Sequence, residues 1–410
     1  MLYLWFIKDI IMEILQSYHN NLLRQVSLDY VRPFYSNIHW DQRMLAIKGS
    51  RGSGKTTLML QHLLKNHGPH AEQALYVSAD FHWFYRNTLF DTTDQFYKNG
   101  GRFLYIDEVH KYPRWSRELK NIYDGFPDLQ VIFSSSSALE IYRGESDLSR
   151  RVMTYLLPGL SFREYLWLML GAQFPKISLE DILTKHAEYS SEIVKRLHPL
   201  PLFRKYLETG YLPIIKAVPE EEVHPRLTQI INTVLENDLV FIENYNAATA
   251  FKVKKLLGLL ADSSPFKPNI AALSRKLDVS RDSVYAWFQH LERAKLLNLL
   301  RHAGKGSSLL QKPDKVYLEN TNLAYALKPS ADRGSVRETF MLNQLINAGH
   351  KVSLAPKGDF LVNDRITLEV GGKSKTGSQI KGLEHAYIVK DDIEYGFAAS
   401  IPLWLFGFLY

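Results

Sequence analysis

The chain has 410 residues, of which 46% are hydrophobic and 23% charged, so it has enough apolar material for about two to four globular domains. It contains no cysteine, which excludes disulfides and thiolate metal sites and fits a cytoplasmic protein. The formal net charge of +7 permits contact with nucleic acid but does not require it.

The first 40 residues predict a helical segment. Residues 1–7 are apolar, but Lys8, Asp9 and Glu13 soon interrupt them, so the stretch is too short and too charged to span a membrane. No small-residue cleavage site follows it. We interpret the segment as an amphipathic helix that packs on the next domain. Alternatively, the start codon is over-extended and residues 1–12 are not native.

A phosphate-binding loop follows. An apolar run at residues 44–47 precedes the sequence GSRGSGKT, and residues 57–64 after it have helical spacing. This is a complete GxxxxGK[ST] motif, in which glycines let backbone N–H groups cradle phosphates. Lys55 would lie beside the β- and γ-phosphates of ATP, and the Thr56 hydroxyl can hold Mg²⁺. The alternative is an ordinary flexible turn. The predicted nucleotide-binding residues are Gly49, Ser50, Arg51, Gly52, Ser53, Gly54, Lys55, Thr56 and Thr57.

Two carboxylates end the next predicted strand. Residues 103–106 are apolar and lead into Asp107 and Glu108, which is a Walker B pattern. Asp107 would hold the Mg²⁺ shell, and Glu108 would orient or deprotonate the attacking water. The alternative is a strand that ends in a solvated acidic turn, which the preceding phosphate loop disfavours.

Up to this point the chain resembles ATPases of the AAA+ type. In such proteins a polar residue at the end of the next strand senses the γ-phosphate, and here Ser134 is the first candidate and Ser136 the second. Alternatively, these serines form a turn that caps a helix. An arginine before the following strand acts as a finger on a neighbouring subunit, and Arg151 holds that position. If Arg151 does so, the active species is a homo-oligomer; otherwise it belongs to a surface pair.

The resemblance extends to prokaryotic AAA-family ATPases with a helical lid, a winged helix and a C-terminal restriction-endonuclease-like domain of the PD-(D/E)xK type. Two positions depart from the family pattern, because Ser135 and Arg150 replace usual glycines. The second change leaves the finger open between Arg150 and Arg151. The segments that carry the resemblance are residues 49–56, 105–110, 134–137, 157–166, 206–213 and 315–323.

These patterns predict an α/β fold with several domains. The core would be a P-loop parallel sheet, and the lid would close over the base and ribose or act only as connecting scaffold. The predicted domains are an N-terminal helical segment at 1–40, the ATPase core at 41–160, the lid at 161–245, the winged helix at 246–330 and the endonuclease-like domain at 331–410.

A helix-turn-helix is predicted within the winged helix. Residues 268–277 and 281–291 read as two helices, with Ser280 as the N-cap of the second. On a DNA-binding interpretation the phosphate contacts are Arg275, Lys276, Arg281 and Lys305. Alternatively, the domain only packs or binds a partner, with Tyr285 and Trp287 as interface aromatics.

The C-terminal domain carries an acidic set. By the resemblance, Glu338, Asp359 and Glu369 would bind Mg²⁺ in a nuclease site. The nuclease lysine is expected two residues after the glutamate, on the same strand face, but Gly371 stands there. Either a backbone bulge returns Lys373 to the site, or the fold persists without cleavage.

Three functions follow from these readings. The first is an ATPase switch that acts on a nucleic-acid or protein partner, with DNA contacted through the winged helix and the C-terminal domain. The second is an ATP-gated, Mg²⁺-dependent nuclease. The third is a non-catalytic DNA-binding regulator that uses nucleotide only to set its shape.

Overall fold

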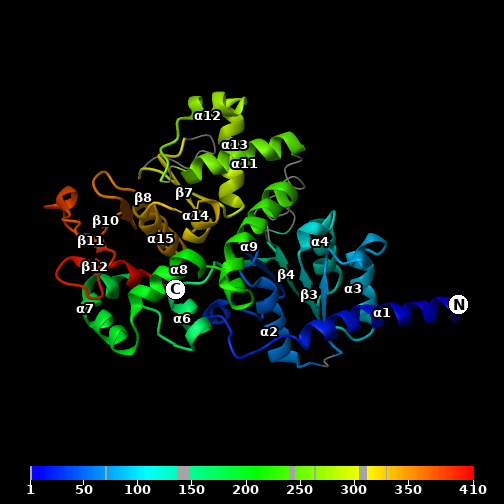
Figure 1. Cartoon of the computed structure of the whole chain (residues 1–410). Coiled ribbons are helices and arrows are strands. Elements are labelled where there is room, and N and C mark those ends of the chain that lie inside the picture. The colour runs from blue at the N-terminus through cyan, green and yellow to red at the C-terminus, as the bar shows by residue number, and fades with distance from the viewer. Residues whose placement is uncertain are drawn as a thin grey trace. The chain divides into compact units, whose positions relative to one another are not determined.

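The chain forms two compact units, residues 1–158 and residues 159–410 (Figure 1). The computed structural model describes residues 2–69, 72–135, 148, 150–239, 245–262, 265–303, 312–328 and 330–410, with side chains from residue 12 onward.

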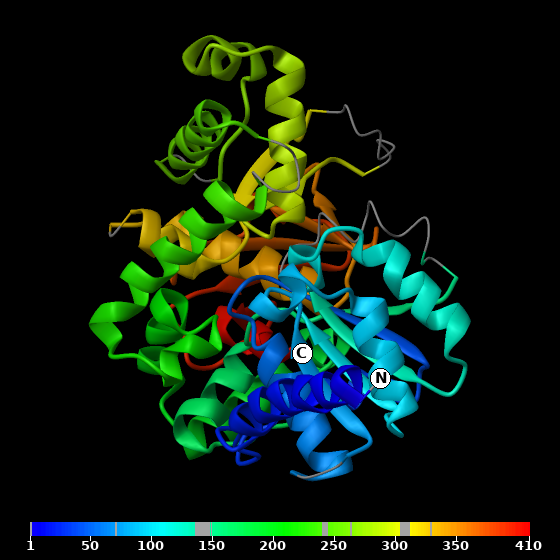
Figure 2. The ribbon, with the colours of Figure 1, turned by 90° about the vertical axis from the view of Figure 1, so that its right-hand side faces the viewer.

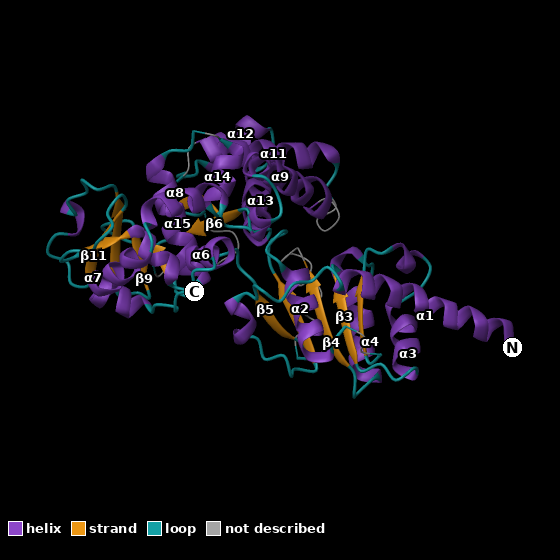
Figure 3. Ribbon diagram, turned by 60° about the horizontal axis from the view of Figure 1, so that its bottom comes forward, coloured by secondary structure: helices purple, strands orange, loops and turns teal. Residues whose placement is uncertain are grey.

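The first unit contains a five-stranded parallel sheet of order β2-β3-β4-β1-β5, with helices beside it (Figure 3). Strands β1 and β2 are buried along their whole length, as expected for parallel strands covered on both faces. β5 is the exception, because most of its residues are exposed. The strands are β1 (Met44–Lys48), β2 (Ala74–Ser78), β3 (Phe103–Asp107), β4 (Gln130–Ser135) and β5 (Met153–Leu156).

Helices cover both faces of this sheet. Leu58 and Leu63 of α2 pack in one core with Ile47, whereas Leu119 of α4 packs in the other core with Ala46. Adjacent strand residues point to opposite faces, so β1 alone supplies both cores. The helices of the unit are α1 (Leu2–Leu23), α2 (Lys55–His67), α3 (Leu89–Lys98) and α4 (Trp115–Gly125), with 3-10 turns η1 (Pro33–Asn37), η2 (His82–Tyr85) and η3 (Val109–Lys111).

The N-terminal helix packs on the first unit, as predicted. Met12, Leu15, His19 and Leu23 are buried, and their spacing of three or four places them on one helical face. The helix contacts β2, the edge strand of the sheet, and its course along this unit can be followed in Figure 2.

The second unit is mostly helical around one hydrophobic core. Phe203, in the segment predicted as a lid, meets Phe340 of the C-terminal segment edge to face, with ring centroids 4.8 Å apart. The predicted lid and the C-terminal segment therefore share their apolar core. The helices are α6 (Phe162–Leu170), α7 (Leu179–Arg196), α8 (Pro199–Thr209), η4 (Pro213–Lys216), α9 (Glu220–Thr233), the π-turn η5 (Val234–Asp238), α11 (Ala247–Asp262), α12 (Ile270–Leu277), α13 (Arg281–Arg293), α14 (Thr321–Leu327), α15 (Arg333–Asn347), η6 (Ser378–Ile380) and η7 (Leu403–Phe408).

Two sheets complete the second unit. Two strands form an antiparallel hairpin after α13, and five strands form a mixed sheet of order β12-β11-β10-β9-β8. In the mixed sheet, β8, β9 and β10 are antiparallel, whereas β10, β11 and β12 run parallel. The hairpin strands are β6 (Leu297–Leu300) and β7 (Lys315–Leu318), and the others are β8 (Val352–Leu354), β9 (Phe360–Val362), β10 (Ile366–Gly371), β11 (Ala386–Lys390) and β12 (Ser400–Pro402).

A buried polar network joins segments of this unit that are distant in sequence. The Tyr211 hydroxyl donates to Glu319 Oε1 at 2.8 Å, and the Asn343 amide donates to the same oxygen at 3.1 Å. The Asn320 amide donates to Glu319 Oε2 at 2.7 Å. Burial raises the pKa of Glu319. Two of the segments that carry the family resemblance, 206–213 and 315–323, therefore meet at this carboxyl group.

Candidate functional site

The predicted phosphate loop connects β1 to α2 and needs glycine at three positions. Gly52 and Gly54 have φ of 84° and 93°, in the left-handed region that favours glycine. A Cβ at Gly49 would lie 2.5 Å from the Leu157 carbonyl oxygen and 2.8 Å from Ser53 Oγ. Helix α2 begins at Lys55, so its first N–H groups and its positive dipole end border the loop.

Lys55 and Arg32 hold the loop from two sides. Lys55 is almost fully buried, and its ammonium group donates to the carbonyls of Gly49 and Ser50 at 3.1 and 3.0 Å. The Arg32 guanidinium donates to the carbonyls of Ser53 and Pro158 at 3.1 and 2.6 Å. Arg32 was not predicted, because its only signal in the sequence is its charge in an otherwise apolar neighbourhood. Contacts within the chain thus hold the loop in this shape.

Asp107, at the end of β3, is held by hydrogen bonds to both carboxylate oxygens. Its Oδ2 accepts from Thr56 Oγ1 at 2.5 Å and from the Tyr76 hydroxyl at 2.8 Å. Its Oδ1 accepts from the Ser134 hydroxyl and from the Glu108 N–H. Thr56, Asp107 and Ser134 therefore come together, as predicted.

This donor set fits Mg²⁺ with a nucleotide. A threonine hydroxyl and a carboxylate are oxygen ligands of the kind that Mg²⁺ accepts alongside phosphate oxygens. Tyr76 was not predicted, although a tyrosine within a buried apolar strand requires a hydrogen-bond partner.

Glu108 has an unusual backbone conformation. Its φ is 53°, in the left-handed region, which is strained for a residue with a side chain. Its Oε2 lies 3.5 Å from Nε2 of the buried His110 and 3.9 Å from the Arg51 guanidinium of the phosphate loop. The carboxylate is therefore directed toward the loop, as the water-orienting role requires.

Arg151 has a partner within the chain. Its Nε and a terminal nitrogen donate to the two oxygens of Asp124 at 2.9 and 3.1 Å. This bidentate hydrogen bonding lowers the pKa of Asp124. Arg150 is exposed, whereas Ser136 lies outside the described residues. An arginine finger at Arg151 would first have to leave Asp124.

In the C-terminal region the structure brings a different lysine to Glu369. Lys373 is exposed, whereas the Lys375 ammonium lies 3.0 Å from Glu369 Oε1. A Cβ at Gly371 would be 2.7 Å from the Lys375 side chain, so glycine there lets that side chain pass. Glu369 is 1% exposed, and its Oε2 is buried with no hydrogen-bond partner. The return of Lys373, one of the two alternatives left open by the sequence, is not what the structure shows: Lys375 takes that place, which sequence spacing did not indicate.

The other two acidic residues lie on neighbouring elements. Asp359 Oδ2 accepts from the Val370 N–H at 2.8 Å, and Glu338 Oε2 accepts from the Tyr317 hydroxyl at 2.8 Å. Burial and the negative charge of Asp359 raise the pKa of Glu338. Among the residues that the structure describes, however, no three acidic or histidine side chains are grouped closely enough to hold a metal ion.

The helix-turn-helix segment has the predicted helices. Ser280 caps α13, because its hydroxyl accepts from the Ser283 N–H at 3.0 Å. The interpretation of Trp287 as an interface aromatic is wrong, because Trp287 is 5% exposed and packs inside the domain. The predicted phosphate contacts Arg275, Lys276 and Arg281 are exposed, and Lys305 lies outside the described residues.

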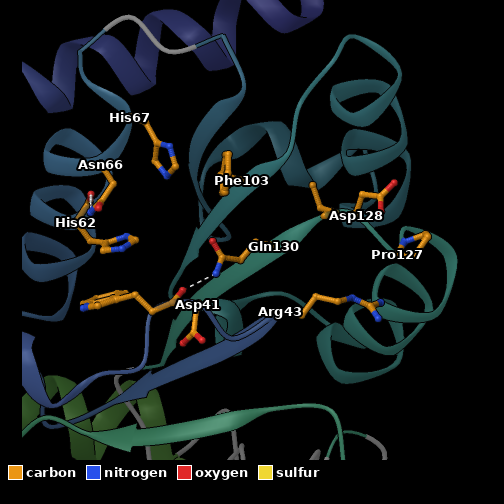
Figure 4. Close-up of a pocket in the computed structure, with 11 residues that line it drawn as sticks. Asp41, Arg43, His62, Asn66, His67, Phe103, Pro127, Asp128 and Gln130 are labelled. Carbon is orange, nitrogen blue, oxygen red and sulfur yellow. Dashed lines mark hydrogen bonds between the residues drawn. The ribbon is translucent and has the colours of Figure 1, made fainter.

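A pocket of about 480 Å³ lies elsewhere on the first unit (Figure 4). Phe103 and Gln130 place it at the amino ends of β3 and β4, whereas Asp107 and Ser134 lie at their carboxyl ends. The Trp40 ring stacks on His62 at 3.9 Å in its wall. The pocket is therefore separate from the predicted nucleotide site. Its lining comprises Trp40, Asp41, Arg43, His62, Asn66, His67, Phe103, Pro127, Asp128, Leu129 and Gln130.

Within the described part of the chain, no helix combines the length and apolar character needed to cross a membrane.

Two family models match parts of the chain. Residues 41–166 match a model described as an AAA domain, and residues 200–333 match a domain of unknown function (DUF8612). Most of the residues that match the AAA model lie in the first unit, which ends at residue 158. An uncharacterized protein of Methanocaldococcus jannaschii is 25% identical over 373 residues, covering 84% of this chain and 78% of the relative.

Solved structures show weaker likeness. PCH-2 of C. elegans is 15% identical, with 68% of each chain covered and a TM-score of 0.24. AMPPCP-bound DnaA from Aquifex aeolicus is 16% identical, with 63% of this chain and 84% of that chain covered and a TM-score of 0.26. The S. cerevisiae Hsp104-ADP complex is 15% identical, with coverage of 67% and 41% and a TM-score of 0.30. All three TM-scores are below 0.5, so these likenesses do not establish a shared overall fold.

Proposed function

We propose that the protein binds ATP with Mg²⁺ and hydrolyses it, and that the nucleotide state switches a nucleic-acid or protein partner. The observation that carries the proposal is the meeting of Thr56 and Asp107 at 2.5 Å beside a preshaped phosphate loop. The match of residues 41–166 to an AAA domain supports it independently.

Each residue of the site has a role in this proposal. Lys55 binds the β- and γ-phosphates, and Thr56 with Asp107 would hold Mg²⁺, whose charge stabilises the transferring phosphoryl group. Glu108 orients the attacking water and accepts its proton. Ser134 fixes the Asp107 carboxylate and lies where a γ-phosphate sensor is expected.

The switch would act through the second unit. The predicted lid and the C-terminal segment share a core, so we expect them to respond to nucleotide together rather than as separate flexible domains. If Arg151 leaves Asp124 to reach a neighbouring subunit, the active form is a homo-oligomer. We place this activity in the cytoplasm.

Isothermal titration with ATP and Mg²⁺ tests the nucleotide site directly. We expect the wild type to bind, Lys55→Ala to lose detectable binding, and Lys65→Ala to bind normally. Lys65 is the matched control because it lies on the same helix but is exposed. Equal affinities of wild type and Lys55→Ala would contradict the proposal.

A nuclease is the second candidate, favoured by one observation. The Glu369–Lys375 pair places a buried carboxylate of β10 beside an ammonium from the segment that follows this strand. Such sites use these residue types to hold a metal and position water. We expect Mg²⁺-dependent cutting of DNA or RNA that Glu369→Ala and Asp359→Ala abolish. The exposed Asp364→Ala is the control. Uncut substrates with and without ATP would count against this candidate.

A further inference from the structure

We infer that Tyr76 is a positioning residue for Asp107 and thereby sets the Mg²⁺ affinity of the nucleotide site. This inference rests on the proposed function, because it assumes that Thr56 and Asp107 hold Mg²⁺. It concerns a residue of β2, a strand that contributes neither the phosphate loop nor the two acidic residues.

The strand register explains how Tyr76 reaches the aspartate. In the parallel pair β2–β3, Ser78 lies opposite Asp107, and Tyr76 lies opposite Tyr105. Side chains two residues apart on a strand point to the same face, so Tyr76 is a diagonal neighbour of Asp107 on one face of the sheet. Its ring is long enough to bring the hydroxyl to 2.8 Å from Asp107 Oδ2.

The hydrogen bond from this hydroxyl to Asp107 is buried. Tyr76 is 2% exposed, so water does not compete for the bond. The donor is therefore permanently directed at one oxygen of the carboxylate.

Tyr76 can do what Thr56 cannot. Both residues donate to the same oxygen of Asp107, but the Thr56 hydroxyl is itself the proposed Mg²⁺ ligand. A hydroxyl that binds the ion through its oxygen is less free to orient Asp107, the second proposed ligand. Tyr76 is not among the proposed ligands of the ion, so it would hold the carboxylate while the Thr56 hydroxyl served as a ligand.

The N-terminal helix holds Tyr76 in turn. The Tyr76 N–H donates to His19 Nδ1 at 2.9 Å, and the Tyr18 ring stacks near the Tyr76 ring with centroids 6.4 Å apart. Burial lowers the pKa of His19 to about 4, so the imidazole is neutral and able to accept at neutral pH. A chain of contacts thus runs from α1 through Tyr76 to the proposed metal ligand.

The test compares Tyr76→Phe with Tyr105→Phe. Tyr105 is the matched control because it is opposite Tyr76 in the sheet and fully buried, and its hydroxyl bonds to His62 Nδ1 at 2.7 Å instead of to Asp107. Both variants keep the ring and lose one buried hydroxyl. Melting temperatures of both report any general loss of stability.

The decisive readout is the Mg²⁺ concentration that gives half-maximal tightening of ATP binding, measured by titration without turnover. We expect Tyr76→Phe to raise it by about 10- to 100-fold, which is the effect of one lost hydrogen bond to a charged group. ATP affinity in EDTA should stay within about twofold of wild type, since the hydroxyl does not touch phosphate. Tyr105→Phe should leave the Mg²⁺ dependence unchanged.

An unchanged Mg²⁺ dependence in Tyr76→Phe, or an equal shift in both variants, would overturn the inference and leave the proposed function standing. If the wild type shows no Mg²⁺-dependent binding of ATP at all, the proposed function fails, and this inference fails with it.

Discussion

The nucleotide site and the acidic C-terminal site each place a buried carboxylate late in a β-strand, yet they satisfy it differently. Asp107 accepts hydrogen bonds on both oxygens, from residues of three neighbouring segments and from the next N–H. Glu369 has a lysine at one oxygen and no hydrogen-bond partner for the other.

This difference separates a prepared site from an incomplete one. Buried polar groups are almost always hydrogen-bonded, and leaving one unpaired costs about 1–3 kcal/mol or more. Contacts within the chain satisfy and orient both oxygens of Asp107. At Glu369 they orient only one oxygen, so the chain itself holds this carboxylate less firmly. We therefore expect function to depend more steeply on the first site.

The largest effect is expected at Glu108. Glu108→Gln should keep ATP binding but lower the turnover rate by about 100-fold or more, because the water would lose its general base. Measuring both phosphate release and ATP binding for this variant separates turnover from binding. The exposed Glu72→Gln is the control. Turnover at the wild-type rate would remove Glu108 from the mechanism.

The sequence predicted the parts of the nucleotide site that depend on motif spacing. Thr56 and Asp107 meet as expected, because a P-loop and a Walker B strand have fixed positions in the fold. Tyr76 could not be assigned to Asp107, because strand order and register are not readable from one sequence.

The C-terminal site was less predictable for a related reason. Which lysine reaches Glu369 depends on how the loop after β10 returns, and Lys375 rather than Lys373 does so. Likewise, the Arg151–Asp124 pair joins two segments whose proximity only the folded sheet creates.

Amide substitutions compare the two carboxylates directly. Asp107→Asn should lower the free energy of unfolding by about 2 kcal/mol, because hydrogen bonds to a charged carboxylate are replaced by weaker bonds to a neutral amide. Glu369→Gln should change it by less than about 1 kcal/mol, since its NH₂ can occupy the unpaired position while the oxygen still faces Lys375. Urea denaturation of both variants measures the difference, and equal losses would refute the contrast between a prepared and an incomplete site.

Two buried groups, one in each unit, should contribute to the pH dependence of stability with opposite signs, His19 between about pH 4 and 6.5 and Glu319 as the pH rises above 4.5. Burial lowers the pKa of His19 from 6.5 to about 4, so the unfolded state binds the extra proton and the first unit loses stability as pH falls. Burial raises the pKa of Glu319 above 4.5, so the folded state keeps the proton and the second unit loses stability as pH rises.

Two substitutions isolate these slopes in urea denaturation across that range. His19→Asn keeps an acceptor for the Tyr76 N–H and should remove a slope of at most about 1.4 kcal/mol per pH unit. Glu319→Gln should remove a slope of opposite sign, although it also places an NH₂ against donors and lowers stability at every pH. The exposed Glu188→Gln should change neither slope. If the two substitutions remove pH slopes of the same sign, then His19 or Glu319 is not the group that causes the slope assigned to it.

The smallest effect is expected at the helix-turn-helix segment of the second unit, which is proposed to contact DNA rather than nucleotide. Arg281 is exposed in the first turn of α13, and Arg275 is exposed on α12, so both can reach phosphates without rearrangement. Arg281→Ala should weaken binding to duplex DNA by roughly threefold and reduce the salt slope by about one, uniformly across sequences. Lys176→Ala, which is also exposed but lies before α7, should leave both unchanged. If the two variants bind alike at low salt, Arg281 does not contact DNA, and a DNA-binding role of the helix-turn-helix loses its support.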